Sequence, residues 1–420
     1  MLDALRGGDS VRAYPLAVAC AAIAAALAPA YVVRWHVGFY PTTALEAGIL
    51  LTFATFAFES IRNKELPAWR SPLTIPAALL LLAGAISIIV APSRLAALGI
   101  YRAYFVEPIV FALVLVATLH TYRQARIVVL GAVSGATVLG VVNSAMTIKA
   151  LLNHSFDPIL SPQLAPPVAI YTAANAIALY LVPLIALVAA MLVHEQDQRF
   201  RVAWGIFVAV ATLSVLLTFS RGGWVVLAVV AVGLIFSSRH RRRWLGALAA
   251  GMLLFLLVPG IAQRIQADLT FGPNQTLDGR MPLWDASLRM LAHRPIFGAG
   301  LSGFFERMKT DATDYPNNLI FPHNILLNFW SETGLLGVLA FTAVFVVVAV
   351  VSWRGWRRGT ADWRPVHLGV LLAMMAILVH GLVDVPYFKN DLALEFWLLA
   401  GLTLAGRRDA TRLQLTRFDR

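Results

Sequence analysis

The chain has 420 residues, of which 59% are apolar and 13% charged, and its mean hydropathy is +0.74. A water-soluble domain carries about 25% charged residues, so the composition excludes a soluble globular protein and favours one that lies largely in lipid. The net charge of +12 fits either nucleic acid or a membrane surface, and the single cysteine, Cys20, excludes an internal disulfide and a cysteine metal cluster.

Apolar runs of about 20 residues, the length that crosses a bilayer, recur along the chain. They centre on residues 15–33, 42–58, 74–92, 103–119, 126–146, 170–193, 202–219, 222–238, 244–261, 333–352, 366–385 and 391–406. We therefore predict an all-α integral membrane protein of about twelve transmembrane helices. Residues 1–420 are expected to form a single polytopic membrane domain.

The positions of lysine and arginine predict its orientation, because these residues concentrate in cytoplasmic loops. With a cytoplasmic N-terminus, the inside segments hold 22 of the 34 lysines and arginines. The outside segments hold the other 12, and six of those lie in the loop 262–332. We expect both termini in the cytoplasm and one large outward loop between helices nine and ten. This distribution explains the basic charge by membrane topology and contact with membrane lipids. We therefore do not expect nucleic acid as a partner.

The outward loop 262–332 holds most of the polar sequence information. One stretch has apolar residues at helical spacing, which predicts a short amphipathic helix on the membrane: Met281, Trp284, Leu288 and Leu291. A glycine-rich turn at 295–304 and the triplet Pro322-His323-Asn324 follow. A loop of this length is too long for a simple connector, so we expect it to carry part of a functional site.

Three residues that face outward are candidates for chemistry. Arg221 lies in Ser220-Arg221-Gly-Gly-Trp224, at the outer end of the seventh span, where arginine is disfavoured. It is either a snorkelling headgroup anchor or part of an anion site, and the neighbouring glycines favour the anion site. His323 is the best outward candidate for a general base, the alternative being a histidine that caps the next helix. Arg280, without its neighbours, reads as an ordinary loop arginine.

Five further polar residues lie in the outward halves or at the outer boundaries of spans, where such groups are costly and often functional: Glu46, Arg102, Glu107, His380 and Asp384. The structural alternative is an ion pair of Arg102 with Glu46 or Glu107 that orders the bundle, and we favour it. Asp384 is instead placed to orient a catalytic group.

The order and spacing of these motifs resemble the O-antigen ligase and polymerase superfamily over roughly residues 205–350. The matching motifs are Ser220-Arg221-Gly-Gly-Trp224, Arg280-x3-Trp284 with the glycine-rich turn, and Pro322-His323-Asn324-x8-Glu332-x-Gly334. The resemblance implies a GT-C-like glycosyltransferase of the bacterial inner membrane with its active site facing the periplasm. Its donor would be a glycan on undecaprenyl pyrophosphate, and its acceptor lipid A–core.

The resemblance also implies roles for residues. Arg221 and Arg280 would hold the pyrophosphate, and His323 would activate the acceptor hydroxyl. Asp384, Arg102, Glu46 and Asn324 are supporting candidates. The chain has no Asp-x-Asp motif of the kind that holds a metal in many glycosyltransferases, whereas arginine binds phosphate bidentately and stays charged. We therefore predict a metal-independent, inverting transfer that needs no cofactor.

Other functions remain open. A polymerase of the same superfamily is the main alternative, and the single dominant outer loop favours a ligase over it. An oligosaccharyltransferase that acts on protein is less favoured, because the chain carries no extra soluble domain. A secondary transporter of two six-helix halves usually has its long loop between spans six and seven, where residues 194–201 here are short. Repeats with broken helices, typical of transporters, are not apparent either.

Overall fold

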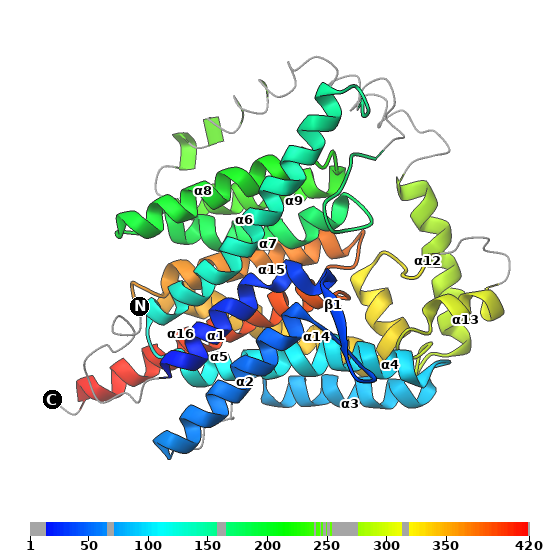
Figure 1. Ribbon diagram of the computed structural model, residues 1–420, viewed down its shortest axis with the longest axis horizontal. Coiled ribbons are helices and arrows are strands. Elements are labelled where there is room, and N and C mark those ends of the chain that lie inside the picture. Colours follow the sequence, from blue (N-terminus) through cyan, green and yellow to red (C-terminus); the bar gives the residue numbers. More distant parts are fainter. Residues whose placement is uncertain are drawn as a thin grey trace.

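The computed structural model describes residues 14–64, 71–157, 165–238, 276–312 and 319–418, together with 241–243, 245–246, 249 and 253. Figure 1 shows the elements, which are in chain order α1 (Pro15–Ala26), η2 (Ala28–Val32), β1 (Arg34–Val37), β2 (Tyr40–Thr43), α2 (Ala44–Asn63), α3 (Thr74–Val90), α4 (Arg94–Tyr101), η3 (Arg102–Val106), α5 (Glu107–Thr118), α6 (Tyr122–Leu152), α7 (Asn175–Leu192), α8 (Gln198–Leu216), α9 (Arg221–Ser237), α12 (Thr276–His293), α13 (Phe304–Asp311), α14 (Ile325–Arg358), α15 (Arg364–Gly381) and α16 (Asn390–Phe418).

Within the described residues, seven helices are long and apolar enough to cross a membrane: α2, the continuous stretch from α4 to α5, α6, α7, α8, α14 and α15. The helices α1, α3 and α9 are shorter and also apolar. The chain is a multi-pass, mainly α-helical membrane protein, as composition predicted. The ninth predicted span, 244–261, falls mostly outside the described residues, and each of the others coincides with a helix. The count of twelve and the place of the long loop between helices nine and ten stay predictions.

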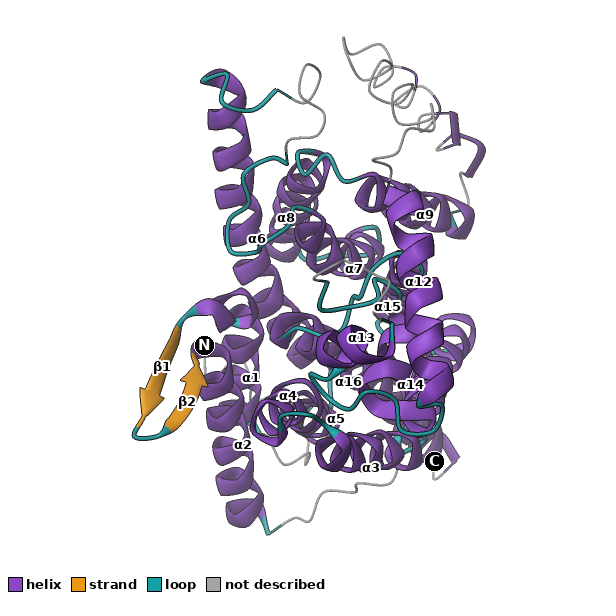
Figure 2. Cartoon of the chain, turned by 90° about the vertical axis from the view of Figure 1, so that its right-hand side faces the viewer, coloured by secondary structure: helices purple, strands orange, loops and turns teal. Residues whose placement is uncertain are grey.

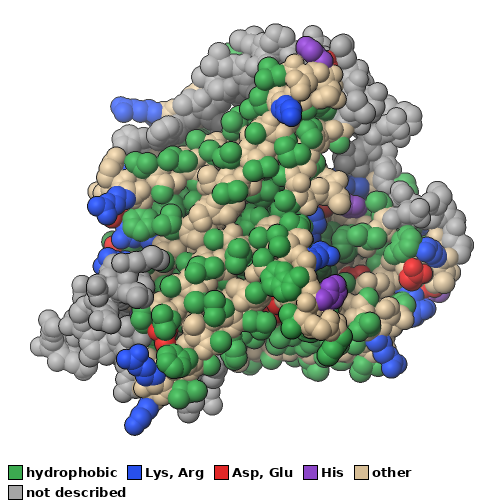
Figure 3. All heavy atoms as spheres, viewed as in Figure 1, with side chains coloured by type: hydrophobic (Ala, Val, Ile, Leu, Met, Phe, Trp, Pro, Cys, Tyr) green, Lys and Arg blue, Asp and Glu red, His purple; other side chains and the backbone are tan. Residues whose placement is uncertain are grey.

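The long helices run side by side, and the chain alternates in direction along them (Figure 1). The helices α12 and α13 and the β1–β2 hairpin lie at the right-hand end in that view, which we call the site end. Figure 3 shows lysine and arginine side chains mainly towards the two ends, with a largely hydrophobic surface between them. This distribution is what a helix bundle in a bilayer requires.

Small residues let the helices approach one another closely. Gly131 and Gly135 of α6 lie directly against the backbone of Ala22 and Ala26 in α1, where an added Cβ would meet carbonyl oxygens at 2.0 and 2.1 Å. Lipid supplies no hydrophobic drive between helices, so such close backbone packing is a main source of association in membranes. Substituting either glycine would force α1 and α6 apart.

A sharp kink divides α14 near its start. Gly334 has φ +68°, a conformation that favours glycine, and its Cβ position is filled by the carbonyl of Ile296 at 2.4 Å. The glycine-rich turn enters this kink: Ala299 N–H donates to Ser331 O at 2.6 Å, and Leu335 N–H donates to Ile296 O at 2.9 Å. The turn thus satisfies backbone groups that the kink leaves unpaired, and it fixes α12 and α13 to α14.

The predicted amphipathic helix is present as α12. Leu283, Ala286 and Met290 are buried against Phe304 and Met308 of α13. Met281 and Leu288, which were expected on the apolar face with Trp284 and Leu291, are 60% and 48% exposed. Leu291, also of the predicted apolar face, is 1% exposed and belongs to the same cluster as Leu283 and Met290. Contact of Met281 and Leu288 with the membrane stays a prediction.

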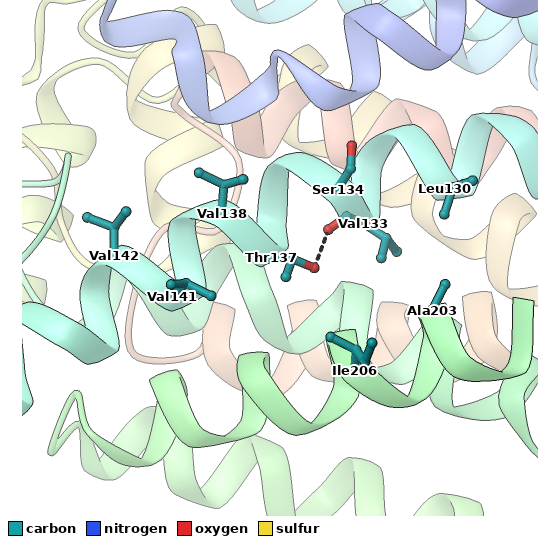
Figure 4. Close-up of a pocket in the computed structure, with 9 residues that line it drawn as sticks. All are labelled: Leu130, Val133, Ser134, Thr137, Val138, Val141, Val142, Ala203 and Ile206. Carbon is teal, nitrogen blue, oxygen red and sulfur yellow. Dashed lines mark hydrogen bonds between the residues drawn. The ribbon is translucent and has the colours of Figure 1, made fainter. Parts of the chain in front are cut away.

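A groove of about 420 Å³ lies between α6 and α8, in the span region rather than at the site end (Figure 4). It is lined by Leu130, Val133, Ser134, Thr137, Val138, Val141, Val142, Ala203 and Ile206. Its two hydroxyls are bonded within α6, Ser134 to Gly131 O and Thr137 to Val133 O, both at 2.7 Å. The groove therefore offers an apolar surface and no free polar group for chemistry.

Candidate active site

His323 lies at the site end, immediately before α14, in a conformation that its neighbours impose. Its φ is +49°, a left-handed value that costs a non-glycine residue about 1–3 kcal/mol. Asn324 caps α14, because its Oδ1 accepts from the backbone N–H groups of Leu326 and Leu327, each at 3.1 Å. The Asn324 amide also donates to Leu382 O at 3.1 Å. These bonds fix the backbone beside His323 to the end of α15.

Asp384 orients the His323 ring. His323 Nδ1 lies 3.1 Å from Asp384 Oδ1, and the side chains are 29% and 7% exposed. Asp384 Oδ1 also accepts from Val385 N–H at 2.9 Å, and Asn175 at the start of α7 donates to Asp384 Oδ2. Burial alone would raise the pKa of Asp384, but the His323 hydrogen bond and charge hold it below its ordinary value. A carboxylate acceptor at Nδ1 leaves Nε2 of His323 free to take a proton.

Arg280 is brought to this pair by the helix α12. Trp284, one turn further along α12, donates from Nε1 to Pro322 O at 3.0 Å, which anchors the helix beside His323. Arg280 is half-buried, and burial lowers the pKa of its guanidinium while the Asp384 carboxylate opposes that shift. Arginine stays protonated despite such a shift. The Arg280-x3-Trp284 spacing thus places a permanent cation within electrostatic range of Asp384.

Arg221 begins α9 at the same end of the bundle. Ser220 caps the helix through its Oγ, which accepts from Gly223 N–H at 3.3 Å. Gly222 lies against His380, whose Nε2 would be 3.2 Å from an added Cβ, and His380 in turn interacts electrostatically with Arg280 and Asp384. The glycines after Arg221 therefore let the start of α9 approach the end of α15. The exposed Arg221 guanidinium and the helix N-terminus both favour an anion there.

Two residues at this site were not singled out by sequence reasoning. Asn175 holds Asp384, as described above. Lys389 is half-buried five residues after Asp384, with its Nζ 4.7 Å from the centre of the Tyr171 ring. Burial lowers the pKa of Lys389, against the opposing charges of Asp391 and Asp384. Lys389 lies between the predicted spans 366–385 and 391–406, in a segment predicted to face outward, and lysine is disfavoured in outward segments. Its position is therefore the sequence signal that points to it.

Glu332 of α14 holds the backbone that follows the glycine-rich turn in place. It is 2% exposed, and its Oε2 accepts from Ser302 N–H at 2.5 Å. The Phe304 N–H also donates to it. One buried carboxylate thus binds the amides at the start of α13 to α14, two residues before the kink at Gly334. This explains the spacing from Pro322-His323-Asn324 to Glu332 as a way to hold loop and helix together.

Arg102, Glu46 and Glu107 form a separate cluster. Arg102 Nη1 is 2.8 Å from Glu46 Oε1, and Arg102 Nε is 3.2 Å from Glu107 Oε1. Within the described part of the chain, no hydrogen bond or ion pair joins these groups to His323, Asp384 or Arg280. The ion pairs are those of the structural alternative, in which Arg102 orders the bundle.

The site end thus combines the His323 imidazole, oriented by Asp384, with the cationic side chains of Arg280, Arg221 and Lys389. Residues 262–275 and 313–318 of the predicted loop lie outside the described residues, whereas Arg280 and His323 lie within them. The cations suit a ligand with a multiply charged phosphate, and the imidazole suits proton removal from a hydroxyl. The site therefore fits group transfer from a phosphorylated donor to a hydroxyl.

Comparison with known families agrees with this chemistry. Residues 206–342 match the family described as O-antigen ligase, and this range includes Arg221, Arg280 and His323. The match confirms the resemblance to the O-antigen ligase superfamily that the motifs indicated, and it indicates a membrane enzyme related to glycosyl transfer. A comparison with curated proteins finds no match.

Proposed function

We propose that this protein is an O-antigen ligase, which transfers O-antigen polysaccharide from undecaprenyl pyrophosphate to lipid A–core in lipopolysaccharide biosynthesis. The observation that carries the proposal is the His323–Asp384 pair with Arg280 in electrostatic range of Asp384; His323 and Arg280 lie inside the stretch that matches the family. The protein would lie in the inner membrane with both termini in the cytoplasm. The site end would then face the periplasm, where both lipid substrates are reached from the bilayer.

The proposed reaction is a single displacement. The acceptor hydroxyl oxygen attacks the anomeric carbon, and the carbon–oxygen bond to the pyrophosphate breaks with its electron pair leaving on the phosphate. His323 Nε2 takes the hydroxyl proton, and Asp384 stabilises the resulting imidazolium through Nδ1–H. Attack from the face opposite the leaving group inverts the anomeric centre.

The leaving pyrophosphate needs positive charge. Arg280 and Arg221 are proposed to supply it, with the α9 N-terminus adding oriented N–H groups next to Arg221. Lys389 is a third cation at the same end, and within the described residues no carboxylate oxygen lies within 4 Å of its Nζ. We propose that these side chains do the work without a metal ion, so transfer should persist in the presence of a chelator.

The test is the lipopolysaccharide of a strain that lacks this gene and is complemented with the parent chain or Arg280→Ala. The proposal expects core without O-antigen, and long polymer retained on the lipid carrier, in the deletion strain and in the Arg280→Ala strain. Core that carries a single repeat unit without a ladder would show a polymerase and refute the ligase assignment.

A further inference from the structure

The β1–β2 hairpin projects sideways from the bundle at the site end, beyond α1 and α2, when the molecule is viewed along the helices (Figure 2). It connects the end of the α1–η2 segment with the start of α2, two apolar helices. The two strands are antiparallel, with Val37 paired to Tyr40 across the Gly38-Phe39 turn. The hairpin therefore lies roughly parallel to the membrane plane, at the level where apolar helices end.

The pairing divides the hairpin into two chemically different faces. Trp35, Val37 and Tyr40 share one face, because side chains alternate along a strand and paired residues share a side. Arg34 and His36 lie on the other face and are exposed. Phe39, in the turn, is 96% exposed. Trp35, Val37 and Phe39 are thus large apolar side chains exposed close together, as on a surface that interacts with a partner or a membrane.

The hairpin is rigidly attached, so its exposure is a property of the fold. Arg102 donates to Pro41 O from both Nη atoms, at 3.3 and 3.4 Å, and covers the Tyr40 ring at 4.5 Å. The Tyr40 hydroxyl donates to Glu46. Arg102 also pairs with Glu46 and Glu107, as described above. The ion cluster thus holds β2, at Tyr40 and Pro41 next to the turn, to α2 and α5.

We propose that the β1–β2 hairpin is an interfacial anchor whose partner is the lipid leaflet at the site end. Trp35, Val37 and Phe39 enter the boundary between headgroups and acyl chains, and Arg34 and His36 face lipid phosphates. Two observations select lipid as the occupant. The apolar surface continues on neighbouring helices, as exposed Ile23 in α1, Leu50 and Leu51 in α2, and Leu95 and Leu98 in α4. Aromatic rings beside cations also match the composition of membrane interfaces.

The single native cysteine makes a direct test simple. In a Cys20→Ser background, Phe39→Cys is labelled with an environment-sensitive fluorophore and reconstituted in vesicles of phosphatidylethanolamine and phosphatidylglycerol. Nitroxide lipids carry the quencher either near the headgroup or near the end of the acyl chain. Glu306→Cys, on the exposed side of α13, is the matched control because its side chain is 57% exposed and charged.

The expected result is blue-shifted emission from the Phe39 label and quenching severalfold stronger than at position 306, greatest with the quencher near the headgroup. An anchor of this kind lies about 5–10 Å into the headgroup and acyl boundary. Emission and quenching equal to those at position 306 would overturn the proposal. Blue-shifted emission without quenching would also overturn it, since a protein surface would then cover the hairpin. Val37→Cys gives the same reading if Phe39→Cys is not recovered.

Discussion

Asp384→Asn isolates the contribution of one negative charge to the proposed chemistry. The substitution keeps the shape of the side chain, and its Oδ1 can still accept from His323 Nδ1–H and Val385 N–H. Its new amide meets the Asn175 donor, but Asn175 can turn its own amide and present an oxygen instead. The fold should therefore persist while the charge beside His323 is lost.

The size of the effect follows from the contact. Two unit charges about 4 Å apart interact by about 4 kcal/mol at the effective dielectric constant of a site near a protein surface. Each 1.36 kcal/mol of transition-state stabilisation is about a tenfold change in rate. Since the His323 side chain is 29% exposed and partly screened, we expect kcat to fall by about 10²–10³-fold, with little change in the KM for the donor.

The assay is transfer by the purified protein in vesicles, with saturating lipid-linked glycan and lipid A–core. Asp311→Asn serves as the control, because it also removes an aspartate from an ion pair, with Arg294 at 2.7 Å, but away from His323. It should retain the parent rate. If Asp384→Asn kept most of the parent kcat, Asp384 would not support a charged His323 in the transition state, and the proposed base would be wrong.

Three other perturbations have defined outcomes. Lys389→Ala should raise the KM for the lipid-linked donor about tenfold or more, whereas Lys389→Arg restores it; a change in kcat alone would speak against a phosphate contact. Glu332→Ala leaves the Ser302 and Phe304 amides without their acceptor, which should lower the free energy of unfolding by about 1–3 kcal/mol for each amide. The measurement is the thermal midpoint in detergent, which should fall. An unchanged midpoint would contradict the role of Glu332 in holding the turn. Because the folded pKa of Asp384 is below its ordinary value, its charge stabilises the fold above about pH 4 and this is lost as pH falls through the folded pKa. The stability difference between the parent and Asp384→Asn should therefore disappear in acid, and a difference that grew there would reverse the sign of the argument.

The sequence pointed to the titratable and charged side chains of the candidate site. It did not point to the neutral side chain that positions Asp384. Asp384 was predicted because charged groups at the outer ends of spans are expensive. His323 was predicted as an outward residue able to act as a base near neutral pH, and Arg280 was assigned a role only through the resemblance to the family. The partner of Asp384, Asn175, could not be found this way, since an asparagine at a helix start has many ordinary uses. Only the packing of α7 against α15 shows that its amide reaches Asp384.

The helices themselves were easier to predict than their rotations. Hydropathy located the apolar helices because a span needs a fixed apolar length. It did not show which stripe of α12 packs on α13, because the contacts of Leu283 and Met290 depend on a helix that follows later in the chain. The kink at Gly334 likewise depends on Ile296 and the glycine-rich turn, which are distant in sequence from α14.

The most direct test of the central claim is transfer by the purified protein in vesicles, with undecaprenyl-pyrophosphate-linked O-antigen as donor and lipid A–core as acceptor. The account predicts that the parent chain forms polysaccharide-bearing lipid A–core. His323→Ala and Arg280→Ala, folded to the same thermal midpoint, should lose at least about 10²-fold in rate. Absence of transfer by the parent chain, or near-parent rates in both variants, would contradict it.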